Sequence, residues 1–485
     1  MQMKLKELLT EECGILDRRG AEDVEVMSLQ QDSRKVEAGS VFFAVRGTVS
    51  DGHDFIEPAL EKGAVAVVCE ELPEVLRPEV CYLRVKDSSV AMGYMASAFY
   101  GNPSRELKLV GITGTNGKTT TVTLLYRLFK GLGYEVGLLS TIENRIGDRV
   151  VPSTHTTGDA LEINALLREM VDAGCDYAFM EVSSHAVVQE RIAGLHFAGA
   201  IFSNITRDHL DYHKTFDAYI KAKKKFFDNL PSSAFALVNA DDKNGLVMLQ
   251  NTKASKYTYA LRVPADFKCR LLDDSLSGLH LEMDGTEVYM RLVGRFNAYN
   301  LTAIYATALL LGMDKMEVLQ AMSNLGEAPG RFEVFKSQRD GKTGIVDYAH
   351  TPDALENVLE TINELRQDGQ QVICVVGCGG NRDAGKRPEM ARIAARLSDR
   401  LIITTDNPRF EEPQAIAEQM KAGLDMLDAA KSLCILDREE AIKTACALAG
   451  PEDVILVAGK GHEPYQEVKG VKHHFDDREV LVKYL

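Results

Sequence analysis

The segment GITGTNGKTT at residues 111–120 constrains what this chain can fold into more than any other stretch. Residues 107–110 before it, apolar except for Lys108, predict a buried strand, and residues 119–130 after it predict a helix. A glycine-rich turn between a strand and a helix presents backbone N–H groups and the positive end of the helix dipole to one point. Lys118 adds a charge suited to the outer phosphates of a nucleotide, and Thr119 adds a hydroxyl suited to Mg²⁺. The segment therefore predicts a nucleoside triphosphate site in an α/β domain.

This segment departs from the usual phosphate-loop pattern in one respect. The pattern G-x-x-x-x-G-K-[ST] requires glycine at Ile112, whereas the glycines here are Gly111, Gly114 and Gly117. The alternative interpretation is an ordinary strand-to-helix turn that happens to be rich in glycine. The helix that follows the turn favours nucleotide binding.

The length and charge of the chain narrow the possible classes. A chain of 485 residues has room for about three domains. Its 56 basic and 71 acidic side chains give a net charge of −15, which argues against a nucleic-acid partner. The nine cysteines form no C-x-x-C pair and lie mostly in apolar runs, so we expect reduced core residues. The N-terminus lacks the apolar core of a signal peptide and no long apolar run follows, so we expect a cytoplasmic protein that does not span a membrane.

Patterns of strands and helices divide the chain into three predicted domains. Residues 1–103 form a small α/β domain with strands at 24–29, 41–45, 64–69 and 81–85 and a helix at 88–100, and the turn GNPS at 101–104 ends it. Residues 104–332 form the central domain, in which alternating strands and helices predict a mainly parallel sheet. Residues 333–485 restart the same alternation and predict a Rossmann-like α/β domain.

Polar motifs follow two strands of the central domain. The predicted strand 177–180 leads into EVSSH at 181–185, and the predicted strand 199–203 leads into NITRDHLDYH at 204–213. Ligands in open α/β sheets bind beyond the carboxyl ends of the strands. Glu181 at such an end suits a Mg²⁺ ion that bridges nucleotide phosphates, and a solvated strand end is the alternative.

Two further features are ambiguous from the residues alone. The predicted helix 216–229 carries Lys221, Lys223, Lys224 and Lys225, and a lysine run of this kind is usually a solvated face. Ser33, next to Arg34 near the head of a strand, is suited to a phosphate or sugar, but the residues alone favour a solvated turn.

The C-terminal domain carries polar motifs after several predicted parallel strands. These strands span 344–348, 371–377, 401–405 and 454–458. Together the motifs predict one rim of a sheet that faces a ligand. They are DYAH at 347–350, GKR at 385–387, DNPR at 406–409 and GKGHE at 459–463.

These motifs, in this order, resemble the Mur ligase family over all three domains. The resemblance rests on GTNGKT at 114–119, EVSSH at 181–185, NITRDH at 204–209, Phe296 and Asn297 with Asn300, GRFE at 330–333 and DYAH at 347–350. It implies an ATP-dependent ligase of peptidoglycan precursor synthesis. The implied reaction adds meso-2,6-diaminopimelate to the D-glutamate side-chain carboxylate of UDP-N-acetylmuramoyl-L-alanyl-D-glutamate through an acyl phosphate.

The resemblance also implies roles for individual residues. Lys223 matches the position where lysine becomes a carbamate (N6-carboxylysine), so one lysine of the run would point inward while Lys221, Lys224 and Lys225 stay solvated. Lys118, Glu181, His209 and Lys223 match catalytic positions, and Thr119, Glu181, His209 and Lys223 match metal positions for Mg²⁺. The implied ATP contacts are Gly114, Thr115, Asn116, Gly117, Lys118, Thr119, Thr120, Asn300, Arg331 and Asp347. The implied UDP-sugar-peptide contacts are Ser33, Thr156, Thr157, Ser183, Gln189 and Arg191, and the implied diaminopimelate contacts are Arg387, Asp406, Asn407, Pro408, Arg409, Gly459 and Glu463.

Three alternatives to this function differ in what they would require. A lysine-adding ligase of the same family would generally lack the arginine of the DNPR motif, here Arg409. A folylpoly-γ-glutamate synthase would share the core, but the first domain and DNPR argue against it. A nucleotide-dependent switch or motor would hydrolyse ATP without an acceptor amine, and the polar C-terminal rim argues for a further substrate instead. We expect a monomer that binds ATP, the UDP-linked dipeptide and meso-diaminopimelate.

Overall fold

The structure is a computed structural model of the 485-residue chain and describes residues 2–21, 23–47, 50–153, 156–206 and 210–485. It forms two compact units, one of residues Met1–Tyr259 with Ala306–Met313 and the other of residues Ala260–Tyr305 with Asp314–Leu485. None of the helices among the described residues combines the length and the apolarity needed to span a bilayer. The predicted α/β class with mostly parallel sheets is confirmed, whereas the three predicted domain ranges remain predictions.

The N-terminal part of the first unit contains a five-stranded sheet in the order β2-β7-β6-β5-β4, in which β4, β5, β6 and β7 are parallel. β2 pairs with β7 in the antiparallel direction. The strands are β1 Met3–Lys4, β2 Ile15–Gly20, β3 Glu25–Val26, β4 Ser28–Gln30, β5 Ser40–Phe43, β6 Ala64–Cys69 and β7 Cys81–Val85. The helices are α1 Ile56–Glu61 and α2 Ser88–Phe99, with the 3₁₀ helices η1 Leu5–Leu8, η2 Glu11–Cys13, η3 Ser33–Lys35, η4 Gly52–Phe55 and η5 Pro103–Arg105.

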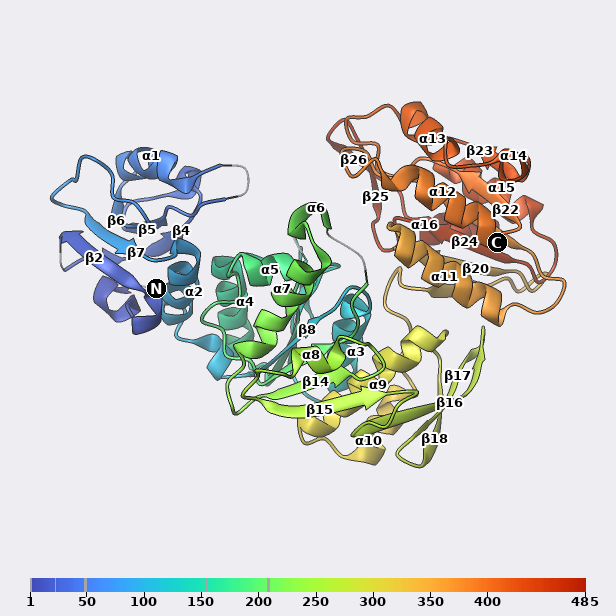
Figure 1. Ribbon diagram of the computed structural model, residues 1–485, viewed down its shortest axis with the longest axis horizontal. Coiled ribbons are helices and arrows are strands. Elements are labelled where there is room, and N and C mark those ends of the chain that lie inside the picture. The colour runs from blue at the N-terminus through green and yellow to red at the C-terminus, as the bar shows by residue number, and fades with distance from the viewer. Residues whose placement is uncertain (1, 22, 48–49, 154–155, 207–209) are drawn as a thin grey trace. The chain divides into compact units, whose positions relative to one another are not determined.

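In the central sheet of the first unit, β8 pairs with β12 on one side and with β13 on the other. Figure 1 labels β8, β14 and β15 of this sheet. From β8 the chain crosses to β9 and β12 on one side and later to β13, β14 and β15 on the other, so the strand order reverses at β8. Such a switch point is where ligands bind in open parallel sheets. The strands are β8 Lys108–Thr113, β9 Val136–Leu139, β10 Asn144–Ile146, β11 Arg149–Val151, β12 Tyr177–Glu181, β13 Gly199–Phe202, β14 Phe235–Asn239 and β15 Ser255–Ala260. The helices are α3 Lys118–Gly131, α4 Ala160–Asp172, α5 Ser184–Val188, α6 Leu210–His213, α7 Phe216–Asp228 and α8 Gly245–Met248.

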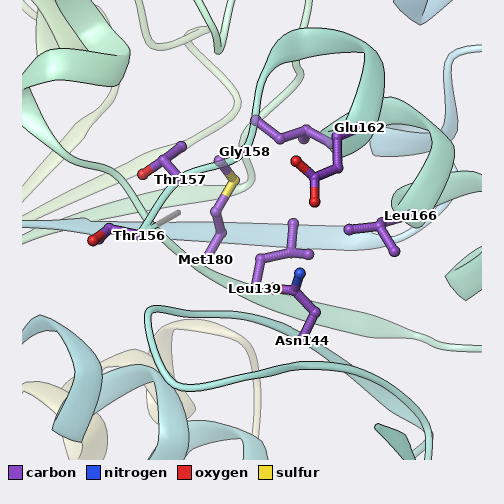
Figure 2. A pocket seen from close by; sticks show the side chains of 9 residues that line it. Leu139, Asn144, Thr156, Thr157, Gly158, Glu162, Leu166 and Met180 are labelled. Carbon is purple, nitrogen blue, oxygen red and sulfur yellow. The ribbon is translucent and has the colours of Figure 1, made fainter. Parts of the chain in front are cut away.

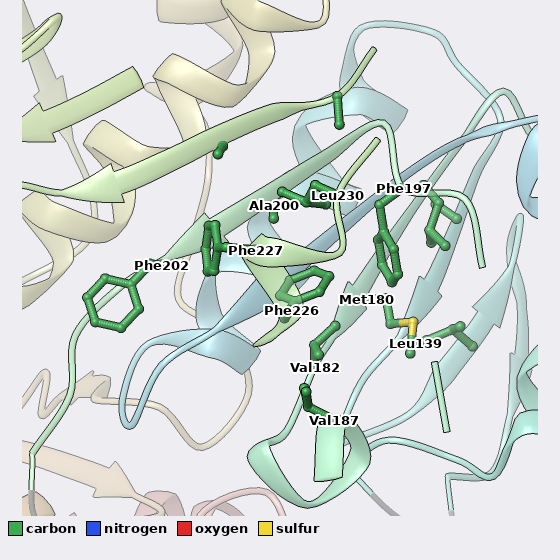
Figure 3. Packing of buried hydrophobic residues seen from close by; sticks show 14 of the residues in the cluster. Leu139, Met180, Val182, Val187, Phe197, Ala200, Phe202, Phe226, Phe227 and Leu230 are labelled. Carbon is green, nitrogen blue, oxygen red and sulfur yellow. The ribbon is translucent and has the colours of Figure 1, made fainter. Parts of the chain in front are cut away.

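A core of aromatic and aliphatic side chains lies under this switch point (Figure 3). Phe197 and Phe226 pack edge to face with their ring centroids 4.9 Å apart. A Cβ atom on Gly111 of β8 would lie 2.7 Å from Phe226 and 2.9 Å from Phe197. Glycine at 111 therefore lets the aromatic core close against the strand that carries the phosphate loop.

The second unit contains a six-stranded sheet in the order β19-β20-β24-β21-β22-β23, parallel except for the edge strand β19. Its apolar strands are buried between helices, as expected for a parallel sheet. The strands of this unit are β16 Phe267–Ser275, β17 Gly278–Met283, β18 Thr286–Met290, β19 Glu333–Lys336, β20 Thr343–Asp347, β21 Val372–Val376, β22 Arg400–Ile403, β23 Ser432–Cys434, β24 Val454–Ala458, β25 Tyr465–Val468 and β26 Val471–His474. The helices are α9 Arg295–Leu310, which runs on into the first unit, α10 Lys315–Met322, α11 Pro352–Leu365, α12 Lys386–Leu397, α13 Pro413–Lys421, α14 Met426–Ala430, α15 Arg438–Leu448 and α16 Asp477–Tyr484.

Two parts of the chain differ from the sequence-based expectation. Residues 267–290 form the antiparallel ladder β16-β17-β18 instead of alternating strands and helices. The turn at Asp284 and Gly285 has φ of 47° and 76°, and a two-residue Asp-Gly turn of this kind is a strong hairpin signal. The expected strand 24–29 is divided into β3, which pairs with β1, and β4, which pairs with β5. All nine cysteines are thiols and eight are buried, as expected for reduced core residues.

Candidate active site

The phosphate loop connects β8 to α3. Gly117 is the residue before α3 and has φ of 86°, in the left-handed region that favours glycine. A Cβ atom on Gly114 would lie 1.9 Å from Ser203 Oγ, so only glycine fits that close approach. The predicted strand, turn and helix are therefore confirmed, and the missing glycine at Ile112 has a structural reason. Ile112 is a fully buried residue of β8.

The loop is held from the side by the residues after β13. Asn204 accepts Thr115 N–H through its backbone oxygen at 2.9 Å and Asn116 N–H through Oδ1 at 2.9 Å. Ser203 Oγ and Asn204 Nδ2 both donate to Asn116 O, at 2.7 and 3.1 Å. Asn204 thus stabilises the loop, although the sequence analysis assigned it no role. These contacts turn two loop N–H groups toward the protein, so a phosphate would depend chiefly on the first turn of α3 and on lysine side chains.

Two lysine side chains converge on the loop. Lys118 Nζ donates to Gly114 O at 3.0 Å and to Thr115 O at 2.9 Å. Lys223 Nζ donates to the same Gly114 O at 2.8 Å and lies 4.6 Å from the centre of the Tyr219 ring. Lys223 is 1% exposed, so the predicted inward direction of this lysine is confirmed. Two like charges that share one acceptor repel each other, so this place favours an anion or a lysine that has lost its positive charge.

The rest of the lysine run on α7 is less solvated than predicted. Lys221 is exposed, but the side chain of Lys224 is only 12% exposed and pairs with Asp228 at 2.6 Å. Lys225 is 43% exposed and pairs with Glu190. The prediction of a solvated face is therefore wrong for Lys224, because the i,i+4 pair lets its charge lie against the protein.

Glu181 is the last residue of β12, beside β8, and is 1% exposed. Its Oε1 accepts Thr141 N–H at 2.8 Å, and its backbone oxygen accepts the Thr157 hydroxyl at 2.9 Å. Its Oε2 is buried and has no hydrogen-bond partner among the described residues. An isolated buried carboxylate oxygen is costly, so this atom is suited to a cation. The solvated alternative for Glu181 is wrong.

The predicted sugar-peptide residues that follow β11 and β12 form one network. Thr157 Oγ1 accepts Ser183 N–H at 3.1 Å, and Thr157 O accepts Arg191 Nη1 at 2.7 Å. Arg191 also donates from Nε and Nη2 to Gln189 Oε1, at 3.0 and 2.6 Å. Burial lowers the pKa of Arg191. Ser183 Oγ accepts Ala186 N–H and so caps α5.

Thr156 and Thr157 line a small pocket between β9, β12 and α4 (Figure 2). Gln31 Nε2 donates to Asp159 Oδ2 at 2.7 Å. This hydrogen bond links the segment just before Ser33 to the residue that follows Gly158 of the pocket. Ser33 begins η3 and is half-buried, while Asp32 caps η3 and pairs with Arg34 at 2.9 Å. His209 lies outside the described residues.

Three of the residues predicted to contact ATP lie in the second unit. Asn300, in α9, is 7% exposed and donates to Asn297 Oδ1 at 3.1 Å. Asp347, the last residue of β20, accepts Phe332 N–H at 2.7 Å, and burial raises the pKa of this carboxyl to about 6. Arg331 lies over the ring of Tyr348 at 4.6 Å.

The DNPR and GKGHE motifs meet at the carboxyl ends of β22 and β24. Asn407 is 2% exposed, and its Nδ2 donates to Glu463 Oε2 at 2.7 Å. Arg409 has φ of 50° and donates from Nη1 to Gly380 O at 2.8 Å. A Cβ atom on Gly459, whose φ is 115°, would lie 2.7 Å from Asp406 Oδ2. Gly459 therefore makes room for Asp406, and the predicted polar rim is present.

Arg387 is committed to a partner that the sequence analysis did not identify. It is 1% exposed and pairs with Glu411 through Nη1 at 2.8 Å and Nη2 at 2.9 Å. Nη1 also donates to Gln419 Oε1 at 2.6 Å. The hydrogen bonds from Arg387 hold the pKa of Glu411 at about 2. A direct contact of Arg387 with an amino acid stays a prediction.

A phosphate loop at the switch point of one parallel sheet and a polar rim on a second parallel sheet define a nucleotide-dependent α/β enzyme with a further ligand site. Family models match most of the chain: the Mur ligase family catalytic domain at residues 25–100, the Mur ligase middle domain at 112–308 and the Mur ligase glutamate ligase domain at 330–461. The chain belongs to the Mur ligase family of ATP-dependent ligases, as predicted.

Three proteins that are similar to this chain over nearly its whole length bear the same name. The UDP-N-acetylmuramoyl-L-alanyl-D-glutamate–2,6-diaminopimelate ligase of Cytophaga hutchinsonii is 60% identical over 484 residues, which cover 100% of this chain and 99% of that protein. The ligase of the same name from Parabacteroides distasonis is 59% identical over 462 residues, 95% of each chain. A solved structure of a ligase with this name has 35% identity and a TM-score of 0.69, and the match covers 95% of this chain and 94% of that one.

Proposed function

We propose that this chain is an ATP-dependent ligase that joins meso-2,6-diaminopimelate to the D-glutamate side-chain carboxylate of UDP-N-acetylmuramoyl-L-alanyl-D-glutamate. The observation that carries the proposal is the rim of the second unit, where Asn407, Arg409 and Glu463 offer an amide, a guanidinium and a carboxylate. Relatives up to 60% identical over the full chain bear the name of this activity, which supports the same substrates here.

The amino-acid site suits a substrate with two charged ends. Arginine has five N–H donors. Arg409 donates one of them to Gly380 O, and Glu467 Oε2 lies 3.6 Å from its Nε. The remaining donors can hold the distal carboxylate that distinguishes diaminopimelate from lysine. Asp406 and Glu463 can accept the distal ammonium. We assign Arg387, Asp406, Asn407, Pro408, Arg409, Gly459 and Glu463 to this site.

The phosphate loop suits the activation step. A carboxylate is a poor electrophile, so the γ-phosphoryl group of ATP is first transferred to it, which gives an acyl phosphate and ADP. Lys118 balances the charge of the transferred group, as electrostatic stabilisation requires. The amine then attacks the carbonyl carbon, loses a proton and expels phosphate as the C–N bond forms. Positioning and charge stabilisation suffice for both steps, without a covalent enzyme intermediate.

A divalent cation fits the residues beside the loop. The buried Oε2 of Glu181 has no hydrogen-bond partner in the described part of the chain and is a suitable ligand. Mg²⁺ needs only one or two carboxylates in addition to phosphate oxygens. Thr119 and Lys223 in its carbamate form would hold the metal together with Glu181, and His209 is assigned on the family resemblance alone. Bound Mg²⁺ would neutralise charge on the phosphates.

The other assignments follow the resemblance. Asn300, Arg331 and Asp347 are assigned to ATP, as are the loop residues Gly114 to Thr120. Ser33, Thr156, Thr157, Ser183, Gln189 and Arg191 are assigned to the UDP-linked dipeptide. The shared network of Thr157, Ser183 and Arg191 supports a common ligand for these three.

An assay of ATP-dependent phosphate release tests the proposal. The chain is supplied with the UDP-linked dipeptide and ATP, with and without each candidate amino acid. We expect release to require the dipeptide and meso-diaminopimelate together, with a matching tripeptide product. Release that needs no amine would indicate a switch or motor ATPase, and equal kcat/KM for L-lysine would refute the assigned specificity.

A further inference from the structure

Lys460 lies beneath the amino-acid site and is fully buried. Its Nζ donates to Tyr465 O and to Asn407 Oδ1, the latter at 3.3 Å, and lies 3.5 Å from Glu463 Oε2. A buried ammonium is retained only where it is paired and hydrogen-bonded. This lysine therefore touches two of the residues that we assign to the substrate.

The contacts of Asn407 fix which way its amide faces. Oδ1 accepts Lys460 Nζ at 3.3 Å and Glu467 N–H at 2.8 Å, while Nδ2 donates to Glu463 Oε2 at 2.7 Å. A flipped amide would turn its NH₂ group toward two donors and its oxygen toward a carboxylate. Because all three contacts would then be repulsive, Lys460 acts together with the Glu467 N–H and Glu463 to select the orientation in which the NH₂ group faces Glu463.

The charge of Lys460 also acts on Glu463. Burial raises the pKa of Glu463, the nearby Asp406 raises it further, and Lys460 opposes both effects. A carboxylate that has to accept a substrate ammonium must remain ionised in this buried setting. Lys460 thus acts on the amide of Asn407 and on the carboxylate of Glu463 at once.

We infer that Lys460 is a positioning residue for the incoming amino acid, because it orients the amide of Asn407 and holds the carboxylate of Glu463. This inference rests on the proposed function, since the amino acid in question is meso-diaminopimelate. Lys460 acts through its two neighbours, so its loss should weaken binding of the amino acid and leave the ATP and dipeptide sites unchanged.

The test compares Lys460→Met with wild type in steady-state kinetics with each of the three substrates varied. We expect the KM for meso-diaminopimelate to rise on the order of 10- to 100-fold, as for loss of a hydrogen bond to a charged group. The KM values for ATP and the UDP-linked dipeptide should stay within about twofold. Lys472→Met is the matched control. Both lysines lie against the ring of Tyr465, with Nζ of Lys472 4.0 Å and Nζ of Lys460 5.4 Å from its centre, but Lys472 is exposed on β26.

A double-mutant cycle separates positioning from a general loss of structure. If Lys460 acts through Asn407, the substitution Lys460→Met should raise the KM for diaminopimelate much less in the Asn407→Leu variant than in the wild-type enzyme. Fully additive effects, or an unchanged KM in a folded Lys460→Met variant, would overturn the inference. If that variant does not fold, Lys460→Gln is used, with the same expected and contrary results. A wild-type enzyme inactive with diaminopimelate would instead refute the proposed function.

Discussion

The fully buried ion pair between Arg438 and Asp477 leads to a sharp stability prediction. Both side chains are 0% exposed, and the guanidinium donates from Nε and Nη2 to the two carboxylate oxygens, each at 2.7 Å. Nη2 also donates to Ala458 O at 3.1 Å, and Nη1 donates to Thr405 O at 3.4 Å. The pair therefore joins α15 to α16 and holds the ends of two strands. We predict that Arg438→Met is strongly destabilising.

The magnitude follows from what the substitution leaves behind. Arg438→Met strands the carboxylate of Asp477 in the interior without a cation, and breaking a buried pair in this way costs about 3–5 kcal/mol. Replacing both partners by apolar residues is often neutral, so Arg438→Met combined with Asp477→Leu should recover most of that loss. Leucine at the first position of α16 costs about 0.3–1 kcal/mol through the helix dipole.

Hydrogen exchange in the full-length chain, read by mass spectrometry over α15, α16 and β24, measures the effect where it occurs. The free energy of opening for these peptides should fall by about 3–5 kcal/mol in the single variant and by much less in the double variant. A single variant within about 1 kcal/mol of wild type would contradict the reasoning. So would a double variant as unstable as the single one, since that would show that lost packing, and not the stranded charge, causes the damage.

Three other predictions concern the sites. Lys223→Ala should lower kcat on the order of 10²–10³-fold, and acetate should restore part of the activity if the lysine acts as a carbamate. Lys221→Ala should behave like wild type, and equal tolerance of alanine at both positions would refute the catalytic role of Lys223. Arg409→Ala should remove most of the preference for meso-diaminopimelate over L-lysine in competition assays. A preference of this kind can reach ~10⁴. A wild-type enzyme without the preference would refute the assignment of Arg409. Because burial raises the pKa of Asp347 from 3.8 to about 6, the folded state binds the proton more tightly than the unfolded state, so stability falls as the pH rises between these values. Asp347→Asn should remove about 3 kcal/mol of that fall in urea titrations at several pH values, and identical pH profiles would contradict the shift.

Elements with strong local patterns could be predicted from the sequence. The strands Ala64–Cys69, Cys81–Val85 and Val454–Ala458 have the predicted bounds. Their apolar periodicity and the turn residues beside them act over a few neighbouring residues. The antiparallel ladder of residues 267–290 was missed, because the alternation of strands and helices elsewhere outweighed the Asp284-Gly285 turn.

The sequence by itself also determined the family and the position of the polar motifs at strand ends, because motif order and spacing are local properties of the chain. Only the tertiary structure decided which of those polar groups are paired. It joined Arg387 to Glu411 and Asn204 to the phosphate loop, buried Lys223, and placed Lys460 beneath Asn407. Each of these contacts joins residues brought together only by the packing of different strands and helices. The sequence does not show which group a charged side chain will pair with, because the pairing depends on the distance between the two groups and on their exposure to water, and packing sets both.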